Sequence, residues 1–558
     1  MNRSSNAGDL LQGRITRRRI VTATLATGAI AGLAPASAFG QATPEASPDA
    51  SPEASPAASP VPSSRSGSWF VLSNQQDGGG FTTQADTFEI YSGATRERLG
   101  GFKAPGTTGM CVTAHPTRIL LAMQSGLGIF DIETGKLAAV DLGSATVSSQ
   151  FWLPDPRVFT ATPPRWSFVH TLDSAQAWLI DLDEATGVDL ANLLRTKGST
   201  PAFGNIVFSP SGDFAAAVVD GAGASIFDPE HPQKARKLNG GKPGSLAGLP
   251  GFSASGKLVV YSILGSSTAT EGKLVVEEVA TKKVVLEIGN VSAMTSAMFL
   301  PKSETGILIM GDGEVARQDI ETGREAWSAK TKDLAYAYGF TSDLTHLLYG
   351  SSEKIGGTPF WDVIDLETGE ISPLPGLEGL TYYNGSFPVD SPYTLFGPPY
   401  VSSSVETVDS LVGFDNERQK TSVLLDNVSS WKLSYGYSTS ADGRIALFVD
   451  EDAHLMDLKT GDVQTFPNLT AGGSSHGSFV SLDGSQAAIS AWDASGAGPQ
   501  SVYLIDVAGG GEPEVFKDGV IWLWAGQIKA TAGSGRESAL APAPFLRNMK
   551  RFSPLAIS

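Results

Sequence analysis

A short turn recurs along this chain and limits what it can fold into. The clear copies share an apolar stretch, an aspartate and a glycine, and they read FDIETGK from Phe130, IDLDEATG from Ile180, QDIETGRE from Gln318, IDLETGE from Ile364 and MDLKTGD from Met456. Looser copies begin at Tyr91, Glu277, Gly413 and Ile505. Because Asp and Gly favour tight turns, each copy predicts two short antiparallel strands joined by a turn. One hairpin that returns at a nearly fixed period indicates a repeat architecture.

A second recurring element lies between these turns. It is an apolar strand that ends in a Ser-containing turn with Gly, and the copies are FSPSGDFAAAVV from Phe208, FSASGKLVVYS from Phe252, STSADGRIALFV from Ser438 and VSLDGSQAAIS from Val480, with looser copies at Ala114 and Phe340. Residues 205–240 show a whole unit, which reads as the four strands NIVF, FAAAVV, ASIF and KARKL. Four meandering strands are the composition of one propeller blade.

The spacing of the turns predicts the fold class. Their centres fall near residues 93, 134, 186, 229, 281, 322, 368, 416, 460 and 509. The mean spacing of about 46 residues lies in the range of propeller blades. Helical periodicity is nearly absent, and only VDLANLLRTK from Val188 predicts a short helix. We therefore expect an all-β chain, a β-propeller of about ten four-stranded antiparallel repeats. These form one large ring or two rings, because single rings usually have four to eight blades.

Both signatures resemble those of secreted bacterial β-propeller repeat proteins, the broad WD-repeat-like and quinoprotein-like group. The segment QDIETGREAW, from Gln318 to Trp327, is similar to the quinoprotein repeat. In that repeat, Asp-x-x-Thr-Gly precedes a Trp that packs against the neighbouring blade, and the other copies in this chain lack the Trp. The resemblance implies architecture over residues 68–532. It implies no particular activity, since propellers host unrelated functions.

The first 38 residues have the features of an export signal. Thr16–Val21 holds Arg17 and Arg18 and resembles the twin-arginine signature, an uncharged apolar stretch follows to Leu33, and Ala36-Ser37-Ala38 fits a signal-peptidase site. The apolar stretch is shorter than the roughly 20 residues that a membrane-spanning helix needs. We therefore predict twin-arginine export to the extracellular or cell-envelope space, with cleavage near Ala36 and Ala38. An ordinary secretory signal and an uncleaved anchor are the alternatives.

The remaining boundaries follow from composition. Residues 39–67 are rich in Ala, Ser and Pro and predict a disordered linker, which is either a spacer from the cell surface or a simple tail. Residues 68–532 form the repeat region. Residues 533–558 form a C-terminal tail that carries Arg547, Lys550 and Arg551. This tail either docks on the acidic body or frays.

Charge and cysteine content restrict the partners. The chain has a net charge of −18, and its basic residues are over-represented in the export signal, so the mature chain is more acidic still. Such a body repels phosphate backbones, which argues against nucleic acid. No later stretch spans a membrane, and we expect a monomer. The single cysteine, Cys111, excludes an intramolecular disulfide and is predicted to be a small core residue.

Catalytic and metal-binding motifs are weak. The six histidines form no metal-ligand spacing, so we predict no metal site. His346 is predicted to be a core or edge residue. Gly473–Gly477 matches G-x-S-x-G but leads into a strand rather than a helix, which disfavours a hydrolase. The acidic clusters Asp181–Glu184 and Asp450–Asp452 are predicted to be solvated turn charges, with weak calcium binding as the alternative.

One softer pattern suggests a site. In our parsing, the segments that lead into the first strand of successive repeats carry Tyr336, Tyr382, Tyr435 and His476. Equivalent positions of successive repeats share a face, so these side chains are predicted to surround a central opening. They suit a protein partner or a polar small-molecule or carbohydrate ligand. The alternative is that the tyrosines pack between blades.

The sequence thus favours a secreted, non-catalytic β-propeller that binds a polar ligand or a protein partner. The alternative is a propeller enzyme, such as a lyase, a lactonase or a quinone-dependent dehydrogenase, with its site at the channel mouth. No cofactor can be named from the sequence. The Thr-Gly turns are expected to be structural, with Gly135, Gly323, Gly369 and Gly461 in the left-handed backbone region.

Overall fold

The structure is a computed structural model that describes most of the chain between residues 68 and 525. The described residues are 68–73, 85–113, 115, 117–143, 151–152, 165–171, 176–194, 203–219, 223–238, 250–264, 272–291, 295–311, 313–331, 336–341, 343–351, 360–374, 383–384, 393–397, 410–416, 418, 420–426, 437–440, 444–449, 452–467, 469, 478–481, 483–491, 500–507, 509–510 and 512–525. The predicted export signal (1–38, with Arg17, Arg18, Ala36 and Ala38), linker (39–67) and tail (533–558) lie outside them, so these boundaries stay predictions.

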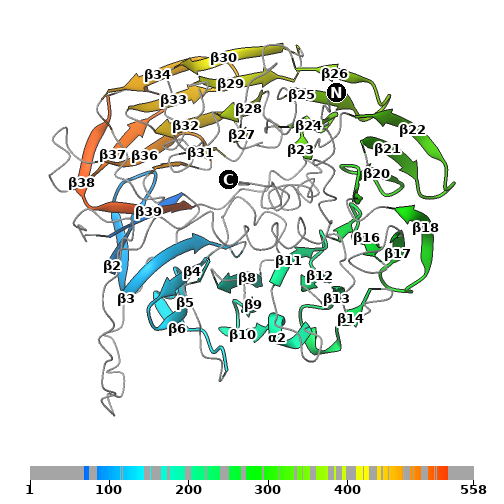
Figure 1. Cartoon of the computed structure of the whole chain (residues 1–558). Helices are drawn as coiled ribbons and strands as arrows, with labels where there is room; N and C mark the ends of the chain where they lie inside the picture. Colours follow the sequence, from blue (N-terminus) through cyan, green and yellow to red (C-terminus); the bar gives the residue numbers. More distant parts are fainter. Residues whose placement is uncertain are drawn as a thin grey trace, which may run out of the picture.

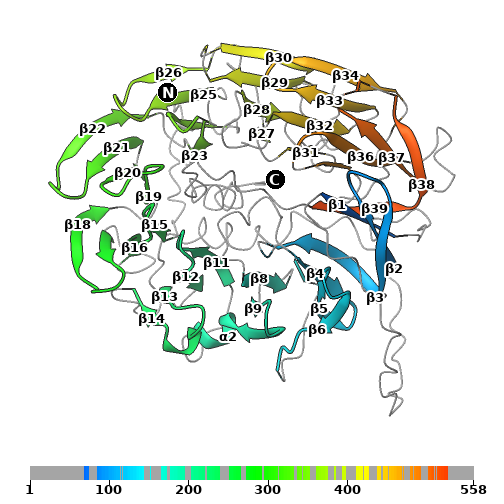
Figure 2. The same ribbon diagram turned by 180° about the vertical axis from the view of Figure 1, so that it is seen from behind.

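The described chain is all-β, and its strands form a series of small antiparallel sheets. Figure 1 shows the sheets following one another in chain order around a centre, and Figure 2 shows the same arrangement from behind. Each four-stranded sheet runs from an inner strand near the centre to an outer strand at the rim. This arrangement is consistent with a β-propeller, as the sequence predicts.

The largest sheet has seven strands. In spatial order these are β39 (Val520–Ala525), β1 (Trp69–Ser73), β2 (Ala85–Ser92), β3 (Arg98–Val112), β4 (Arg118–Met123), β5 (Gly126–Asp131) and β6 (Lys136–Ala139). Two four-stranded groups share the long strand β3. Its first half pairs with β2 and its second half pairs with β4.

The other sheets have four strands each, in chain order from the inner strand to the outer. They are β7 (Phe151–Trp152), β8 (Trp166–Thr171), β9 (Ala177–Asp181) and β10 (Thr186–Asp189); β11 (Phe203–Phe208), β12 (Ala215–Val219), β13 (Gly223–Phe227) and β14 (Arg236–Lys237); β15 (Gly251–Phe252), β16 (Leu258–Leu264), β17 (Gly272–Glu278) and β18 (Val284–Val291); β19 (Ser296–Phe299), β20 (Gly306–Gly311), β21 (Glu314–Asp319) and β22 (Glu325–Lys330). Then follow β23 (Tyr336–Phe340), β24 (His346–Ser351), β25 (Phe360–Asp365) and β26 (Ile371–Pro373); β27 (Tyr383–Asn384), β28 (Tyr393–Gly397), β29 (Ser410–Asp415) and β30 (Lys420–Asp426); β31 (Tyr437–Thr439), β32 (Ile445–Val449), β33 (Ala453–Asp457) and β34 (Asp462–Phe466); and β35 (Ser478–Val480), β36 (Gln486–Ala491), β37 (Ser501–Asp506) and β38 (Glu514–Asp518).

The predicted four-strand unit is confirmed. The Thr-Gly turns join the third strand of a unit to the fourth, as at 132–135, 320–324, 366–370 and 458–461, and the Ser-Gly turns join the first strand to the second, as at 209–214, 253–257 and 481–485. The strands β11, β12, β13 and β14 occupy the four segments parsed from residues 205–240. The predicted short helix is α2 (Leu190–Leu194), which follows β10, and η2 (Pro232–Lys234) is a single 3₁₀ turn before β14. Among the described residues no helix is long and apolar enough to cross a membrane.

Apolar strands are buried on both faces because sheets pack face to face. Every residue is buried in β1 (WFVLS), β32 (IALFV) and β39 (VIWLWA). Clusters of buried side chains lie between consecutive sheets, as shown by the pairs Trp166 and Ile206, Val207 and Phe252, Met298 and Leu347, Leu447 and Ile489, and Leu504 and Phe70. Cys111 belongs to such a cluster and is buried, as predicted.

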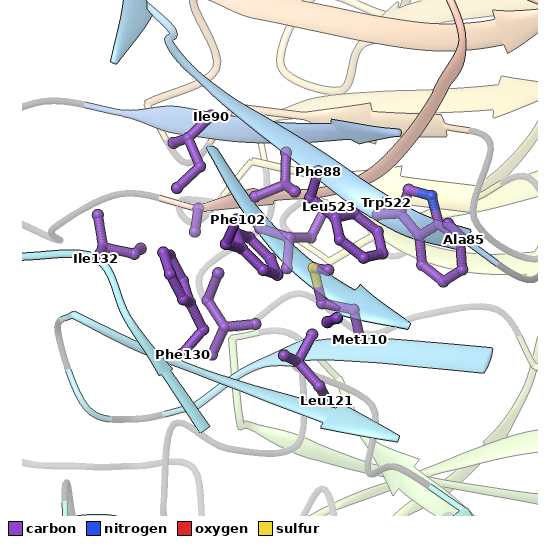
Figure 3. Close-up of a cluster of buried hydrophobic side chains, with 14 of the residues drawn as sticks. Ala85, Phe88, Ile90, Phe102, Met110, Leu121, Phe130, Ile132, Trp522 and Leu523 are labelled. Carbon is purple, nitrogen blue, oxygen red and sulfur yellow. The ribbon is translucent and has the colours of Figure 1, made fainter. Parts of the chain in front are cut away.

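The two ends of the repeat region meet in the seven-stranded sheet. The last strand, β39, pairs antiparallel with the first strand, β1, with Trp69 opposite Ala525 and Phe70 opposite Trp524. Figure 3 shows the core that this pairing completes. Phe88 stacks on Phe102 with ring centroids 4.9 Å apart and meets Trp522 of β39 edge-on at 5.4 Å.

Candidate functional site

The links between strands fall into two sets at opposite ends of the sheets. Because neighbouring strands are antiparallel, links from first to second and from third to fourth strands lie at one end, which we call the turn face. Links from second to third strands and from sheet to sheet lie at the other end, the connection face. The turns between third and fourth strands are mostly short, such as 132–135 and 458–461. On the connection face the links range from Gly519 alone, between β38 and β39, to 238–250, between β14 and β15.

Aspartates hold the turns between third and fourth strands. Oδ1 of Asp457 accepts the backbone N–H groups of Lys459 and Thr460 at 2.9 and 3.3 Å. Asp131, Asp181 and Asp365 make the same pair of bonds in their own turns. The glycine that closes four of these turns has a positive φ, which is 68° at Gly135, 64° at Gly323, 75° at Gly369 and 78° at Gly461. These turns therefore have the structural role predicted for them.

Buried hydroxyls hold the turns between first and second strands. Oγ of Ser481 accepts the backbone N–H of Gln486 at 2.9 Å, and Oγ of Ser440 accepts that of Ile445 at 3.0 Å. Ser209 and Ser253 make the same bond to the residue five positions later. These serines are buried. The recurring serine of the sequence pattern is therefore used by the backbone and is not a free nucleophile.

On the turn face, three arginines join their sheets to the next. Arg165 donates to Asp181 of its own sheet at 2.7 Å and to Glu230 of the β11–β14 sheet at 2.8 Å. Arg317 donates to the carbonyl of Leu366 at 2.9 Å and to Glu367 at 3.0 Å, both in the next sheet. Arg118 bridges in the same way to the carboxylate of Asp183. The charges on this face thus hold neighbouring sheets together.

The structure corrects the prediction for one acidic cluster. Asp181 is buried and ion-paired, so it is not a solvated turn charge. Burial by itself would raise the pKa of Asp181, but the bonds from Arg165 and from two backbone N–H groups outweigh it and hold the pKa below its usual value. The carboxylate of Asp183 is ion-paired with Arg118. Of the second cluster, only Asp452 lies within the described residues.

The carboxyl groups of the described residues share one direction of pKa shift. The carboxyl groups with a shifted pKa all have it lowered, namely Glu89, Asp181, Asp319, Asp365, Asp457 and Asp483. A carboxylic acid that donates a proton near neutral pH needs a raised pKa instead. Burial, assisted by nearby Arg118, lowers the pKa of His115. Within the described ranges no three His, Cys, Asp or Glu side chains gather as a metal site would require.

Most of the predicted site residues lie outside the described part of the chain. Tyr336 is the first residue of the inner strand β23, where its backbone pairs with Gly350. Tyr382, Tyr435 and His476 fall in undescribed segments, as does the whole of Gly473–Gly477. His346, predicted to be a core or edge residue, starts β24, which pairs with β23 and β25; its side chain is half-buried, and its Nδ1 lies 2.7 Å from the hydroxyl of Thr345.

Sequence reasoning missed a polar cluster between β2, near the start of the repeat region, and β38, near its end. Lys517 of β38 forms an ion pair with Glu89 of β2, and its Nζ donates to the hydroxyl of Tyr91 at 3.0 Å. The hydroxyl of Tyr91 donates in turn to Glu89 at 2.8 Å. In the adjoining turn, Arg96 pairs with Glu514. These residues are far apart in sequence, so no local pattern brings them together.

Comparisons with known proteins do not identify a family. No protein-family model and no curated protein matches the sequence. Three solved structures align at low identity: a eukaryotic initiation factor (11% identity, TM-score 0.43, 74% of this chain and 98% of that one), the dihydro-heme d1 dehydrogenase NirN in complex with DHE (12%, 0.38, 74% and 78%) and the tricorn protease (13%, 0.32, 82% and 48%). With TM-scores below 0.5, these likenesses transfer no function to this chain.

Proposed function

We propose that this chain is an exported, non-catalytic β-propeller whose connection face binds a polar ligand, such as a carbohydrate, or a protein partner. The contrast between the two faces carries this proposal. Most links of the turn face are short bonded turns, and 153–165 between β7 and β8 is its longest link, whereas links of very different length recur all around the connection face. Links of variable length on a rigid scaffold are where binding sites usually lie.

The proposed scaffold is a single closed ring of ten blades. Its support is the pairing of β39 with β1, together with apolar clusters between consecutive sheets. The seven-stranded sheet supplies two blades because β3 belongs to both. Two separate rings would each need their own closing strand, so the pairing of β39 with β1 favours one ring.

The residues proposed for binding are those that lead into inner strands. Tyr336 starts β23, Tyr382 directly precedes β27, and Tyr435 and His476 each come shortly before β31 and β35. Links into inner strands belong to the connection face. Aromatic rings and hydroxyls near a central opening offer both apolar area and hydrogen bonds, which suits a sugar or a polar protein surface.

A non-catalytic role is supported by the way the described charges are used. The carboxylates of Asp181, Asp365 and Asp457 cap turns, and Asp181 and Asp457 also pair with arginines. Their lowered pKa values keep them ionised. Groups engaged in this way stabilise the fold and are not available for acid–base chemistry.

A binding screen with matched variants tests this proposal. The purified mature protein is screened against neutral and acidic oligosaccharides by thermal shift, and positives are measured by calorimetry. Tyr336→Ala and Tyr435→Ala are expected to raise Kd at least about tenfold, the loss of one good contact of about 1.4 kcal/mol. Lys459→Ala, on the turn face, is the control and should leave Kd unchanged. An equal loss of affinity in all three variants, or no loss of affinity in the two tyrosine variants, would show that the connection face is not the binding face.

A further inference from the structure

The two ends of the described chain lie together. Ala525, the last residue of β39, pairs with Trp69, the first residue of β1. Both strands are buried along their whole length, so the points where the chain leaves the body are fixed. The aromatic pair Phe70 and Trp524, with ring centroids 4.9 Å apart, adds to this hold.

These ends lie on the turn face. The carbonyl of Ser68 accepts the backbone N–H of Gly93 at 2.7 Å, and Gly93 belongs to the turn between β2 and β3. That turn joins the third and fourth strands of its group, so it is on the turn face. At the other end of β1, the hydroxyl of Ser73 accepts the indole N–H of Trp522 at 2.8 Å, and the chain then enters the link 74–84 of the connection face.

We propose that the linker (39–67) and the C-terminal segment (526–558) leave the body side by side on the turn face. The connection face then points away from whatever holds either end of the chain. This inference rests on the proposed function in one respect, since it says how the proposed binding face is presented. A tether attached to the linker would display that face outward, and would leave the links of variable length unobstructed.

Distances between spin labels test the placement of the ends. The only cysteine, Cys111, is buried, so introduced thiols can be labelled selectively. In the full mature chain, Ser66→Cys is paired with Ala94→Cys on the turn face or with Ser125→Cys on the connection face. Both partner sites are exposed and lie in turns, between β2 and β3 and between β4 and β5. The faces are separated by about 15–20 Å, the length of a five- or six-residue strand.

We expect the distance from residue 66 to residue 94 to be shorter by about 10 Å or more than the distance to residue 125. The same order is expected when Gly526→Cys replaces Ser66→Cys. Equal distances or the reverse order, from either end, would overturn the proposal. An unchanged melting temperature for each labelled protein shows that the variants fold.

This measurement uses no ligand, so it separates the two proposals. A failed oligosaccharide screen would leave the distances as they are, and distances in the wrong order would leave the binding result as it is. When a saccharide from the screen is available, streptavidin on a biotin at residue 125 should block its binding, whereas streptavidin on residue 66 should not. Blocking from residue 66 alone would contradict outward display.

Discussion

The indole ring of Trp327 lies directly against Gly369 of the next sheet. Its Nε1 donates to the carbonyl of Leu366 at 3.3 Å, and a Cβ atom added to Gly369 would lie 2.6 Å from Cδ2 of the ring. This is the contact that the resemblance to quinoprotein repeats implied for Trp327. The same glycine has a φ of 75°, so it serves both the turn and the packing between sheets.

Gly369→Ala is therefore expected to destabilise the protein more than Gly461→Ala. Both glycines have nearly the same positive φ, so both changes add backbone strain of about 1–2 kcal/mol. A Cβ at Gly461 meets nothing within 4 Å, whereas at Gly369 it collides with Trp327. Melting temperatures and urea unfolding of the two variants measure the difference. Equal destabilisation would mean that the contact with Trp327 adds nothing.

A double-mutant cycle isolates that contact. In a Trp327→Ala background, Gly369→Ala should cost no more than Gly461→Ala, because the ring it would strike is gone. If Gly369→Ala destabilised the Trp327→Ala protein as much as it destabilises the wild type, contact with the Trp327 ring would not be the cause.

Glu89→Gln is expected to lower the free energy of unfolding by about 1–3 kcal/mol at pH 7, the range for lost charge-assisted hydrogen bonds. Burial alone would raise the pKa of Glu89, but the bonds from Lys517 and Tyr91 outweigh it and lower the pKa. A lowered folded-state pKa gives stability that is complete above the unfolded-state pKa and is lost as the pH falls through the folded-state value. The difference in the free energy of unfolding between the wild type and the Glu89→Gln variant should therefore decrease below about pH 4.3.

Glu287→Gln is the control for this prediction. Glu287 pairs with Lys273 at 2.6 Å, but both side chains are about half exposed, so the change should have little effect at any pH. A Glu89→Gln gap that stayed constant down to pH 3 would show that the effect is not electrostatic.

Removal of the last strand tests the proposed closed ring. A chain that ends at Gly519 lacks β39 and leaves β1 without its partner, so it should aggregate or melt far below the full-length protein. A chain that ends at Ala525 keeps the strand and serves as the control. If the chain ending at Gly519 melted like this control, β39 would not be needed to close the fold.

The export prediction depends on the paired arginines. Changing both Arg17 and Arg18 to Lys keeps the charge and should trap the precursor in the cytoplasm, because the twin-arginine route reads the residue type. Fractionation and immunoblotting follow the precursor and the mature form. Normal secretion of the double variant would favour an ordinary secretory signal.

Local chemistry made most of the fold predictable. Asp457 and Gly461 reveal their turn because an aspartate that caps backbone N–H groups and a glycine with positive φ are both visible in the sequence. Ser481 reveals the other turn for the same reason. Periodic placement of these residues therefore predicts where strands begin and end.

Contacts between residues far apart in the sequence were much harder to predict. Two strands, β38 and β39, follow the last turn between third and fourth strands, although a unit needs only one there. Only β1 and β2 precede the first such turn, although a unit needs three strands there. The pairing of β39 (Val520–Ala525) with β1 could have been predicted from this surplus and this deficit. The ion pair of buried Asp181 was harder to predict, because its partner Arg165 precedes β8 and comes beside it only when β8 pairs with β9. The site residues Tyr382, Tyr435 and His476 remain predictions from the repeat alone.

The chemical state of a bound ligand tests the central claim most directly. An oligosaccharide that binds in the screen is incubated with the mature protein at saturating concentration for a day, and the ligand recovered is examined by mass spectrometry. A non-catalytic binding propeller returns the ligand unchanged, and its Kd rises in the Tyr336→Ala variant. Product in amounts well above one equivalent of protein, lost in that same variant, would contradict this account and make the connection face an active site.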